Sequence, residues 1–338
     1  MVKTLPKAEL HVHLEGTLSP DMVRSLAQKN KISLPDTLFD KNGQYTWQDD
    51  GSAAASLTGF LSAYDEATKV ISCAQDYTDI SYDYLKNSAA ENVIYVEFII
   101  SADHGKIVGL SYPEMVDAIA KGIQKAQKDF TIEARMLSSC VRHYGPQSAL
   151  NVAQQTVEYP HPLVTGFTMA GDENAYEVID FKPAFDLAKK SGLQVTAHAG
   201  EAAGPQSIRK VRDLLGCTRF GHMVRIIEDD ALMSEMAHQN ITPEVCVSSN
   251  LVLHVYPNYQ SHPIKKLWQA GFNVTLGSDD PPFFFTSIGR EYEIAQQEFG
   301  FTNHDLLQMT QNAIKAAFID DKTRHKLEQK ITLFSNAI

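Results

Sequence analysis

The chain has 338 residues, of which 43% are hydrophobic and 21% charged, a composition typical of globular proteins with a substantial core. Its formal net charge of −11 argues against general nucleic-acid binding, which needs a basic surface. No stretch approaches the roughly 18 consecutive apolar residues of a membrane span, and the first residues lack an apolar signal segment. We therefore expect no membrane partner, a cytoplasmic location and reduced thiols, with Cys140 and Cys246 buried in apolar runs.

Apolar, β-branched runs recur along the chain, and the segments between them have the apolar spacing of helices. Gly192 and Gly271 stand where a helix would end before the next strand. Eight such repeats without a linker predict one (β/α)8 TIM barrel domain spanning residues 1–338. The predicted strands are Ala8–His13, Ile94–Ile100, Ile132–Cys140, Val164–Ala170, Gln194–Ala199, Thr218–His222, Glu244–Ser248 and Val274–Ser278.

The longest insertion, residues 31–75, follows the first predicted strand and includes the aromatic residues Trp47, Phe60 and Tyr64. Loops that follow the strands surround the functional site of such a barrel. The insertion is therefore a candidate helical lid over the site. The alternative is a peripheral helical cap that has no part in catalysis.

Polar residues at predicted strand ends have the chemistry of a metal site. His11 and His13 are two positions apart on one strand, so both imidazoles face the same side. His198 ends the fifth predicted strand, and Asp279 follows the eighth. Three histidines and one aspartate suit a zinc ion with room for a water molecule. We expect one Zn²⁺ per chain.

Three further residues have the features of catalytic or substrate-binding groups. Glu201, three residues after His198, lies too far along the chain to chelate the same ion and suits a general acid or base. His222 is either a further ligand or, with four ligands already in place, a proton acceptor. Asp280 cannot face the metal together with Asp279 and is expected to meet a polar group of the substrate. The three phenylalanines at positions 283–285 are expected either to line the substrate pocket or to pack among the loops of the barrel.

In their order and spacing, these motifs resemble those of the adenosine deaminase family of metal-dependent hydrolases. The resemblance implies zinc held by His11, His13, His198 and Asp279. It also implies that Glu201 protonates purine N1 and that His222 assists the attacking hydroxide. Substrate contacts would come from His13, Glu15, Gly171 (to N3) and Asp280 (to N7). The segments that carry the resemblance are residues 8–16, 169–173, 198–201, 221–222, 248–250 and 278–281.

The resemblance further implies the reaction, the hydrolytic deamination of adenosine and deoxyadenosine to inosine and ammonia in purine salvage. Segments 170–173 and 220–222 look more like the adenosine type than like adenine deaminases. The alternative substrates are adenine and another 6-aminopurine nucleoside such as aminodeoxyfutalosine. Glu15, Met223 and Val247 depart from the family pattern, which has aspartate, glycine and proline at these positions.

Two other classes of protein remain open. A dinuclear amidase or phosphotriesterase on the same barrel usually carries a bridging lysine at the end of the fourth strand, and residues 164–170 contain none. A catalytically silent barrel used for binding would have lost a ligand or the acid, and the sequence retains all of these residues. No pattern specifies the oligomeric state.

Overall fold

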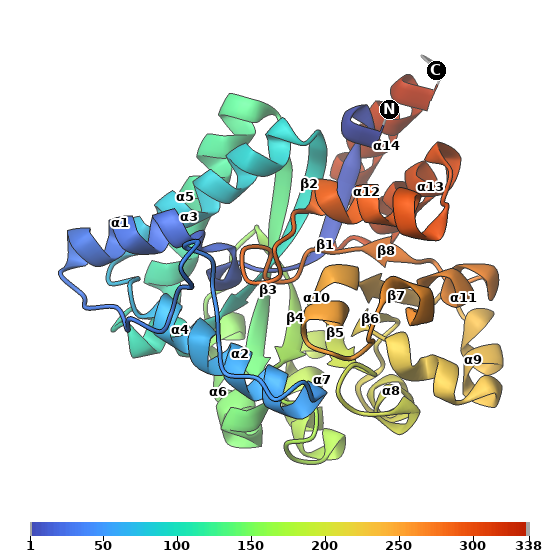
Figure 1. The fold of residues 1–338 in the computed structure, drawn as a ribbon, viewed down its shortest axis with the longest axis horizontal. Helices are drawn as coiled ribbons and strands as arrows, with labels where there is room; N and C mark the ends of the chain where they lie inside the picture. Colours follow the sequence, from blue (N-terminus) through green and yellow to red (C-terminus); the bar gives the residue numbers. More distant parts are fainter. Residues whose placement is uncertain (1, 336–338) are drawn as a thin grey trace.

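The computed structural model describes residues 2–335 and contains eight parallel strands in chain order around one sheet. After β8, the backbone N–H of Asp279 donates to His11 O (3.1 Å), and the N–H of His13 donates to Asp279 O (3.0 Å). These bonds join the last strand segment to the first and confirm the predicted (β/α)8 barrel (Figure 1). The strands are β1 (Lys7–His13), β2 (Val93–Ser101), β3 (Glu133–Val141), β4 (Val164–Ala170), β5 (Gln194–Ala199), β6 (Arg219–His222), β7 (Thr242–Val245) and β8 (Thr275–Leu276).

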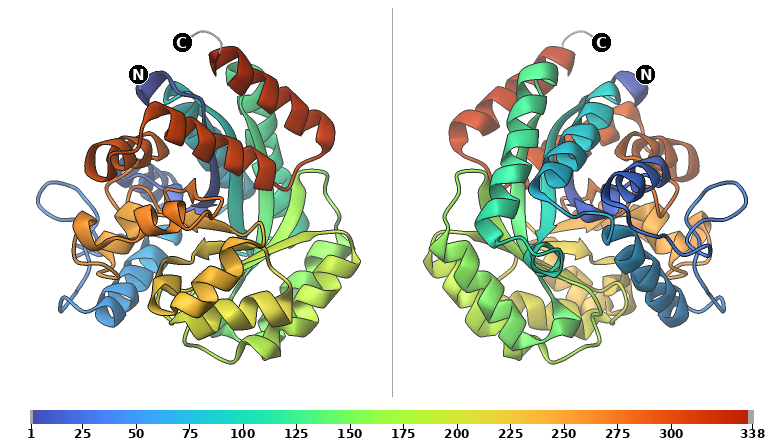
Figure 2. Two further views of the ribbon diagram at one scale, coloured as in Figure 1. Left: turned by 90° about the vertical axis from the view of Figure 1, so that its right-hand side faces the viewer. Right: turned by 90° about the vertical axis from the view of Figure 1, so that its left-hand side faces the viewer.

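Helices surround the barrel on its outer side (Figure 2). The helices are α1 (Pro20–Asn30), α2 (Ala53–Thr68), α3 (Ala74–Ala90), α4 (Ala102–Ile107), α5 (Tyr112–Phe130), α6 (Pro146–Glu158), α7 (Lys182–Lys190), α8 (Pro205–Lys210), α9 (Asp230–Ala237), α10 (Val247–Val252), α11 (Ile264–Gln269), α12 (Ile288–Phe299), α13 (Asn303–Ala316) and α14 (Asp321–Ser335). Among the described residues, no helix is both long and apolar enough to cross a membrane.

Local sequence explains where the elements begin and end. All nine residues of β2 are buried, as expected for a parallel strand covered on both faces. Before α5, Ser111 and Glu114 form a capping box that satisfies the first free N–H groups of the helix. Gly192 and Gly271 have φ angles of 94° and 93°, which confirms that each ends the segment before a strand.

The last two predicted strands differ from those observed. The segment Glu244–Ser248 was expected to be extended throughout, but β7 ends at Val245 and α10 begins at Val247. The buried carboxylate of Glu291 accepts hydrogen bonds from the N–H groups of Val247 (3.1 Å) and Ser248 (3.4 Å), which favours a helix start there. β8 spans only Thr275–Leu276, and the chain then bends toward β1.

The predicted insertion contains α2, and this helix lies at the C-terminal ends of the strands, where a lid was expected (Figure 1). Phe60 packs against Phe283 and Phe284, with ring centroids 5.5 and 4.9 Å apart. All four cysteines are unpaired, and Cys140 and Cys246 are buried as predicted.

Candidate active site

Four residues predicted to bind a metal converge at the C-terminal ends of β1, β5 and β8. The Nε2 atom of His198 lies 3.1 Å from that of His11 and 3.3 Å from that of His13. Oδ1 of Asp279 lies 3.5 Å from Nε2 of His11 and 3.2 Å from Nε2 of His13. One potential ligand atom from each of the four residues thus lies within 4.8 Å of the others, close enough to share one ion.

Neighbouring groups hold these imidazoles so that Nε2 faces the centre of the group. Nδ1 of His11 lies 2.8 Å from Oε2 of Glu244, and Nδ1 of His198 lies 3.0 Å from the carbonyl oxygen of Met169. Burial and the surrounding imidazoles hold the pKa of His198 well below its ordinary value, so its ring is neutral. A neutral imidazole nitrogen can bind a zinc ion, and carboxylate or carbonyl partners of this kind orient metal-bound histidines.

Glu201 and His222 lie beside this group. Oε2 of Glu201 lies 3.4 Å from Nε2 of His222, which is itself 3.9 Å from Oδ2 of Asp279. Burial raises the pKa of Glu201 well above its ordinary value, and the negative charges of Asp279 and Glu173 raise it further. A carboxyl group that stays protonated near neutral pH can donate a proton to a bound base.

Asp280 also keeps its proton, because burial and the adjacent Asp279 raise its pKa well above the ordinary value. Its Oδ1 atom is buried and has no hydrogen-bond partner among the described residues. A side chain at position 16 would place its Cβ 1.7 Å from this oxygen, so only glycine fits at Gly16. The unpaired oxygen is therefore available to a ligand that offers a complementary polar atom.

Glu201, His222, Asp280 and the predicted ligands other than His11 line a small cavity of about 90 Å³. Four side chains of α2 form its roof: Leu57, Phe60, Leu61 and Tyr64. Among the described residues, no lysine or arginine lines the cavity, whereas five carboxylic acids do. These acids are Glu15, Asp65, Glu201, Asp279 and Asp280.

The remaining residues singled out in the sequence fall into two groups. Glu15 and Gly171 line the cavity; Glu15 is buried and accepts hydrogen bonds from Ser101 N (3.2 Å) and Tyr77 Oη (3.4 Å). The three phenylalanines at 283–285 do not line it: two pack in the core and the third is exposed, so the packing alternative holds.

Two of the departures from the family pattern are accommodated outside the cavity. Met223 is fully buried in the core and has a φ of 57°, a left-handed conformation that glycine adopts more easily. Its side chain does not line the cavity. The N–H of Val247, which proline lacks, donates to Glu291.

Sequence reasoning missed several residues around the site. His104 lines the cavity, and its Nε2 lies 3.6 Å from Oδ1 of Asp65. Glu244 is held by Arg219 (2.7 Å), which also contacts Glu97 (2.8 Å); all three side chains are buried in the barrel interior. Glu173 accepts hydrogen bonds from the N–H groups of Gly200, Glu201 and Ala203 and thereby fixes the loop that carries the acid. No signal in the sequence connects these distant positions.

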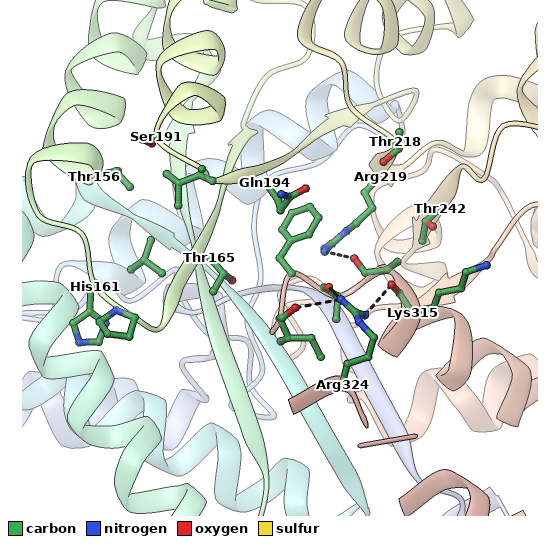
Figure 3. Close-up of a pocket in the computed structure, with 18 of the residues that line it drawn as sticks. Thr156, His161, Thr165, Ser191, Gln194, Thr218, Arg219, Thr242, Lys315 and Arg324 are labelled. Atoms are coloured by element: carbon green, nitrogen blue, oxygen red, sulfur yellow. Dashed lines mark hydrogen bonds between the residues drawn. The ribbon is translucent and has the colours of Figure 1, made fainter. Parts of the chain in front are cut away.

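A second cavity, of about 1070 Å³, opens at the other end of the barrel, where β4, β5, β6 and β7 begin (Figure 3). Thr165, Gln194 and Arg219 line it from these strands, while Arg324 of α14 caps the carbonyl end of α13. Its lining includes none of the predicted ligands and neither Glu201 nor His222. The residues predicted to be catalytic therefore belong to the smaller cavity.

Comparison with known proteins agrees with this geometry. The family model described as adenosine deaminase matches residues 6–333. A protein named adenine deaminase from Agrobacterium fabrum is 42% identical over 327 residues, covering 97% of this chain and 98% of the relative.

Solved structures of similar proteins share the fold over nearly the whole chain. An adenine deaminase from Arthrobacter aurescens has a TM-score of 0.88 at 26% identity, covering 98% of this chain and 99% of that one. A zinc-bound amidohydrolase from Burkholderia ambifaria has a TM-score of 0.88 at 25% identity, with coverage of 99% and 93%. An Arabidopsis N6-mAMP deaminase has a TM-score of 0.83 at 26% identity, with coverage of 98% for both chains.

Proposed function

Because the chain belongs to the adenosine deaminase family, we propose that it is a metal-dependent hydrolase that deaminates a 6-aminopurine, and that this purine is free adenine. The products are hypoxanthine and ammonia. The observation that carries the proposal is the group of four ligand residues, with Glu201 and Asp280 facing the same small cavity.

The residues of the site divide the chemistry between them. We assign one zinc ion per chain to His11, His13, His198 and Asp279; when bound, zinc supplies the positive charge that lowers the pKa of water toward neutrality. The oxygen of water bonds to C6 while Glu201 gives its proton to N1. One proton of the water converts the amino group to ammonia, whose bond to C6 breaks, and the other returns to Glu201 as the C6 oxygen becomes a carbonyl. Asp280 binds N7, and the backbone N–H of Gly171 is assigned to N3.

The charge of the cavity supports a substrate without phosphate. A nucleotide such as the substrate of the N6-mAMP deaminase carries a phosphate, and no lysine or arginine among the described residues lines the cavity to neutralise it. The small volume beneath α2 favours a free base over a nucleoside. The names of the relatives also favour adenine, the alternative substrate of the sequence analysis, over adenosine.

Glu15 is the residue to which we assign the recognition of the free base. Of the five carboxylic acids of the cavity, Glu15 and Asp280 are buried and lie outside the metal-binding group, and Asp280 is already assigned to N7. Adenine carries an N–H on its five-membered ring that a nucleoside lacks, and a carboxylate can accept a hydrogen bond from it. A site built to bond such a group rejects an analogue without it, because its buried acceptor is left unpaired.

Ammonia release from a panel of purines tests the assignment. The metal content of the purified enzyme is measured first. The enzyme is then assayed with adenine, 9-methyladenine, adenosine, deoxyadenosine, aminodeoxyfutalosine and AMP. We expect the largest kcat/KM with adenine and a large loss with 9-methyladenine, which has the base but not the N–H. A larger kcat/KM with adenosine than with adenine would contradict the choice of substrate. Failure to deaminate any purine would contradict the reaction.

A further inference from the structure

A chain of hydrogen bonds runs behind Glu201 and His222, on the side away from the cavity. It begins at the backbone N–H of Ile264 and passes through His262 and Asn250. His262 and Asn250 are buried, with exposed fractions of 4% and 0%. Neither residue is a candidate ligand of the metal, and neither lines the cavity.

The backbone sets the direction of this chain, because an amide N–H can only donate. The N–H of Ile264 donates to Nδ1 of His262 (3.3 Å). Burial lowers the pKa of His262 to about 3, so its ring is neutral and its one proton is on Nε2. That Nε2–H lies 3.2 Å from Oδ1 of Asn250 and donates to it.

The orientation of Asn250 then follows. With its oxygen turned to His262, its NH₂ group points to the catalytic residues and has two hydrogens to give. Nδ2 lies 3.4 Å from Oε1 of Glu201 and 3.3 Å from Nδ1 of His222. Nδ1 of His222 therefore accepts a hydrogen bond, and the proton of a neutral His222 ring lies on Nε2. This N–H faces two acceptors, Oε2 of Glu201 and Oδ2 of Asp279.

We propose that Asn250 and His262 are positioning residues that fix His222 as the Nε2–H tautomer, so that His222 donates a hydrogen bond into the site. With four ligands in place, the sequence alone predicts a proton acceptor at this position; a nitrogen that already carries a proton cannot take another. The consequence for turnover rests on the proposed function, whereas the tautomer itself depends only on the hydrogen bonds described.

Nitrogen NMR of the metal-loaded enzyme labelled with ¹⁵N-histidine reads the tautomer directly. The His222 signals are assigned by their loss in His222→Gln. We expect Nδ1 of His222 to resonate as an unprotonated ring nitrogen and Nε2 as a protonated one. A protonated Nδ1 in the unsubstituted enzyme would overturn the proposal. If the expected tautomer is found but no purine is deaminated, the proposed function fails and the positioning role stands.

Asn250→Asp reverses the hydrogen bond between residue 250 and His222 with almost no change in shape. A carboxylate only accepts, so it should draw the proton of His222 to Nδ1, and the two nitrogen signals should exchange character. We expect kcat to fall about 100-fold, as when one aligned donor is removed from an active site. Asn312→Asp is the matched control, since Asn312 is also buried and donates to Val274 O, outside the small cavity. An unchanged tautomer in Asn250→Asp would overturn the proposal.

Two variants of His262 separate positioning from packing. His262→Gln keeps a side-chain N–H for Asn250, whereas His262→Leu fills the space without a donor. We expect His262→Gln to retain the Nε2–H tautomer of His222 and the kcat, and His262→Leu to lose both. Thermal unfolding shows whether each variant is folded. Equal loss of kcat in the two folded variants, with the tautomer of His222 unchanged in both, would contradict the role.

Discussion

At the scale of single residues, the site depends on backbone conformations that side chains rarely adopt. His222 and Asp279, a proposed catalytic residue and a proposed metal ligand, have φ angles of 61° and 63°. Such conformations cost about 1–3 kcal/mol each and persist where the surroundings hold them. The backbone bonds between Asp279 and β1 supply this restraint and aim the carboxylate at His11 and His13.

Glu201→Gln tests the acid. The amide keeps the shape of the side chain but has no acidic proton, so we expect kcat to fall about 10²- to 10⁴-fold. Metal content should not change, because Glu201 is not in the ligand group. Glu235→Gln, on the surface of α9, is the control and should retain full activity. Loss of metal from Glu201→Gln would show that the residue holds the ion instead.

Glu9 makes the stability of the barrel depend on pH. Burial raises its pKa from 4.5 to about 7, despite hydrogen bonds from Ser278 and Tyr84. Between these two pH values the folded protein therefore holds a proton on Glu9 that the unfolded chain releases. The resulting stabilisation of the folded state is complete below pH 4.5 and is lost as the pH rises through about 7. The shift corresponds to about 3 kcal/mol.

Glu9→Gln should remove that dependence, because glutamine does not titrate. We expect urea unfolding at pH 5 and pH 8 to show a smaller fall in the free energy of unfolding for Glu9→Gln than for the unsubstituted protein. An equal fall in both proteins would mean that Glu9 is ionised in the folded barrel at both pH values.

At the scale of elements, α2 packs against the hydrophobic core and also lines the cavity. Its Phe60 packs against the aromatic residues after β8, while Leu57 and Leu61, four positions apart on one face, cover the cavity. Gly59 lies so close to the preceding loop that an added Cβ would be 2.2 Å from Gln48 O. These contacts place the roof of the cavity close to the metal-binding group.

Leu61→Ala should widen the cavity and relax the choice of substrate. Removing apolar bulk from a binding pocket changes discrimination by about 10-fold or more. We expect the ratio of kcat/KM for adenosine to that for adenine to rise by about this factor. Thr58→Ala, on the exposed face of the same helix, is the control and should leave the ratio unchanged. A ratio that stays constant in Leu61→Ala would show that the roof does not exclude the sugar.

At the scale of the whole molecule, the metal group connects strands from both ends of the chain. Its four proposed ligands come from β1, β5 and the segment after β8, so a bound ion would link elements that are distant in sequence. Binding to the folded state alone stabilises it by mass action, by about 2.7 kcal/mol at a free metal concentration 100 times Kd.

Removal of the metal should therefore lower Tm and abolish activity together. We expect calorimetry of chelator-treated, dialysed protein to give a lower Tm, which zinc restores along with ammonia release. Metal analysis of the restored enzyme should give one ion per chain. A stoichiometry near two would instead support a dinuclear centre, for which the group His222, Cys246 and Asp279 would supply further ligands.

The sequence by itself determined the barrel and predicted the group of residues proposed to bind the metal, because both depend on signals carried by neighbouring residues. β-Branched runs specify strands, and polar residues such as His11, His13 and His198 at their ends must meet once parallel strands lie side by side. It did not determine the residues that orient them. Glu244 contacts His11 across 233 positions, and Arg219 contacts Glu97 across 122. Likewise, only the fold brought His262 and Asn250 behind His222. These contacts depend on strand register, barrel closure and the exact path of the loops, which no short stretch of sequence encodes.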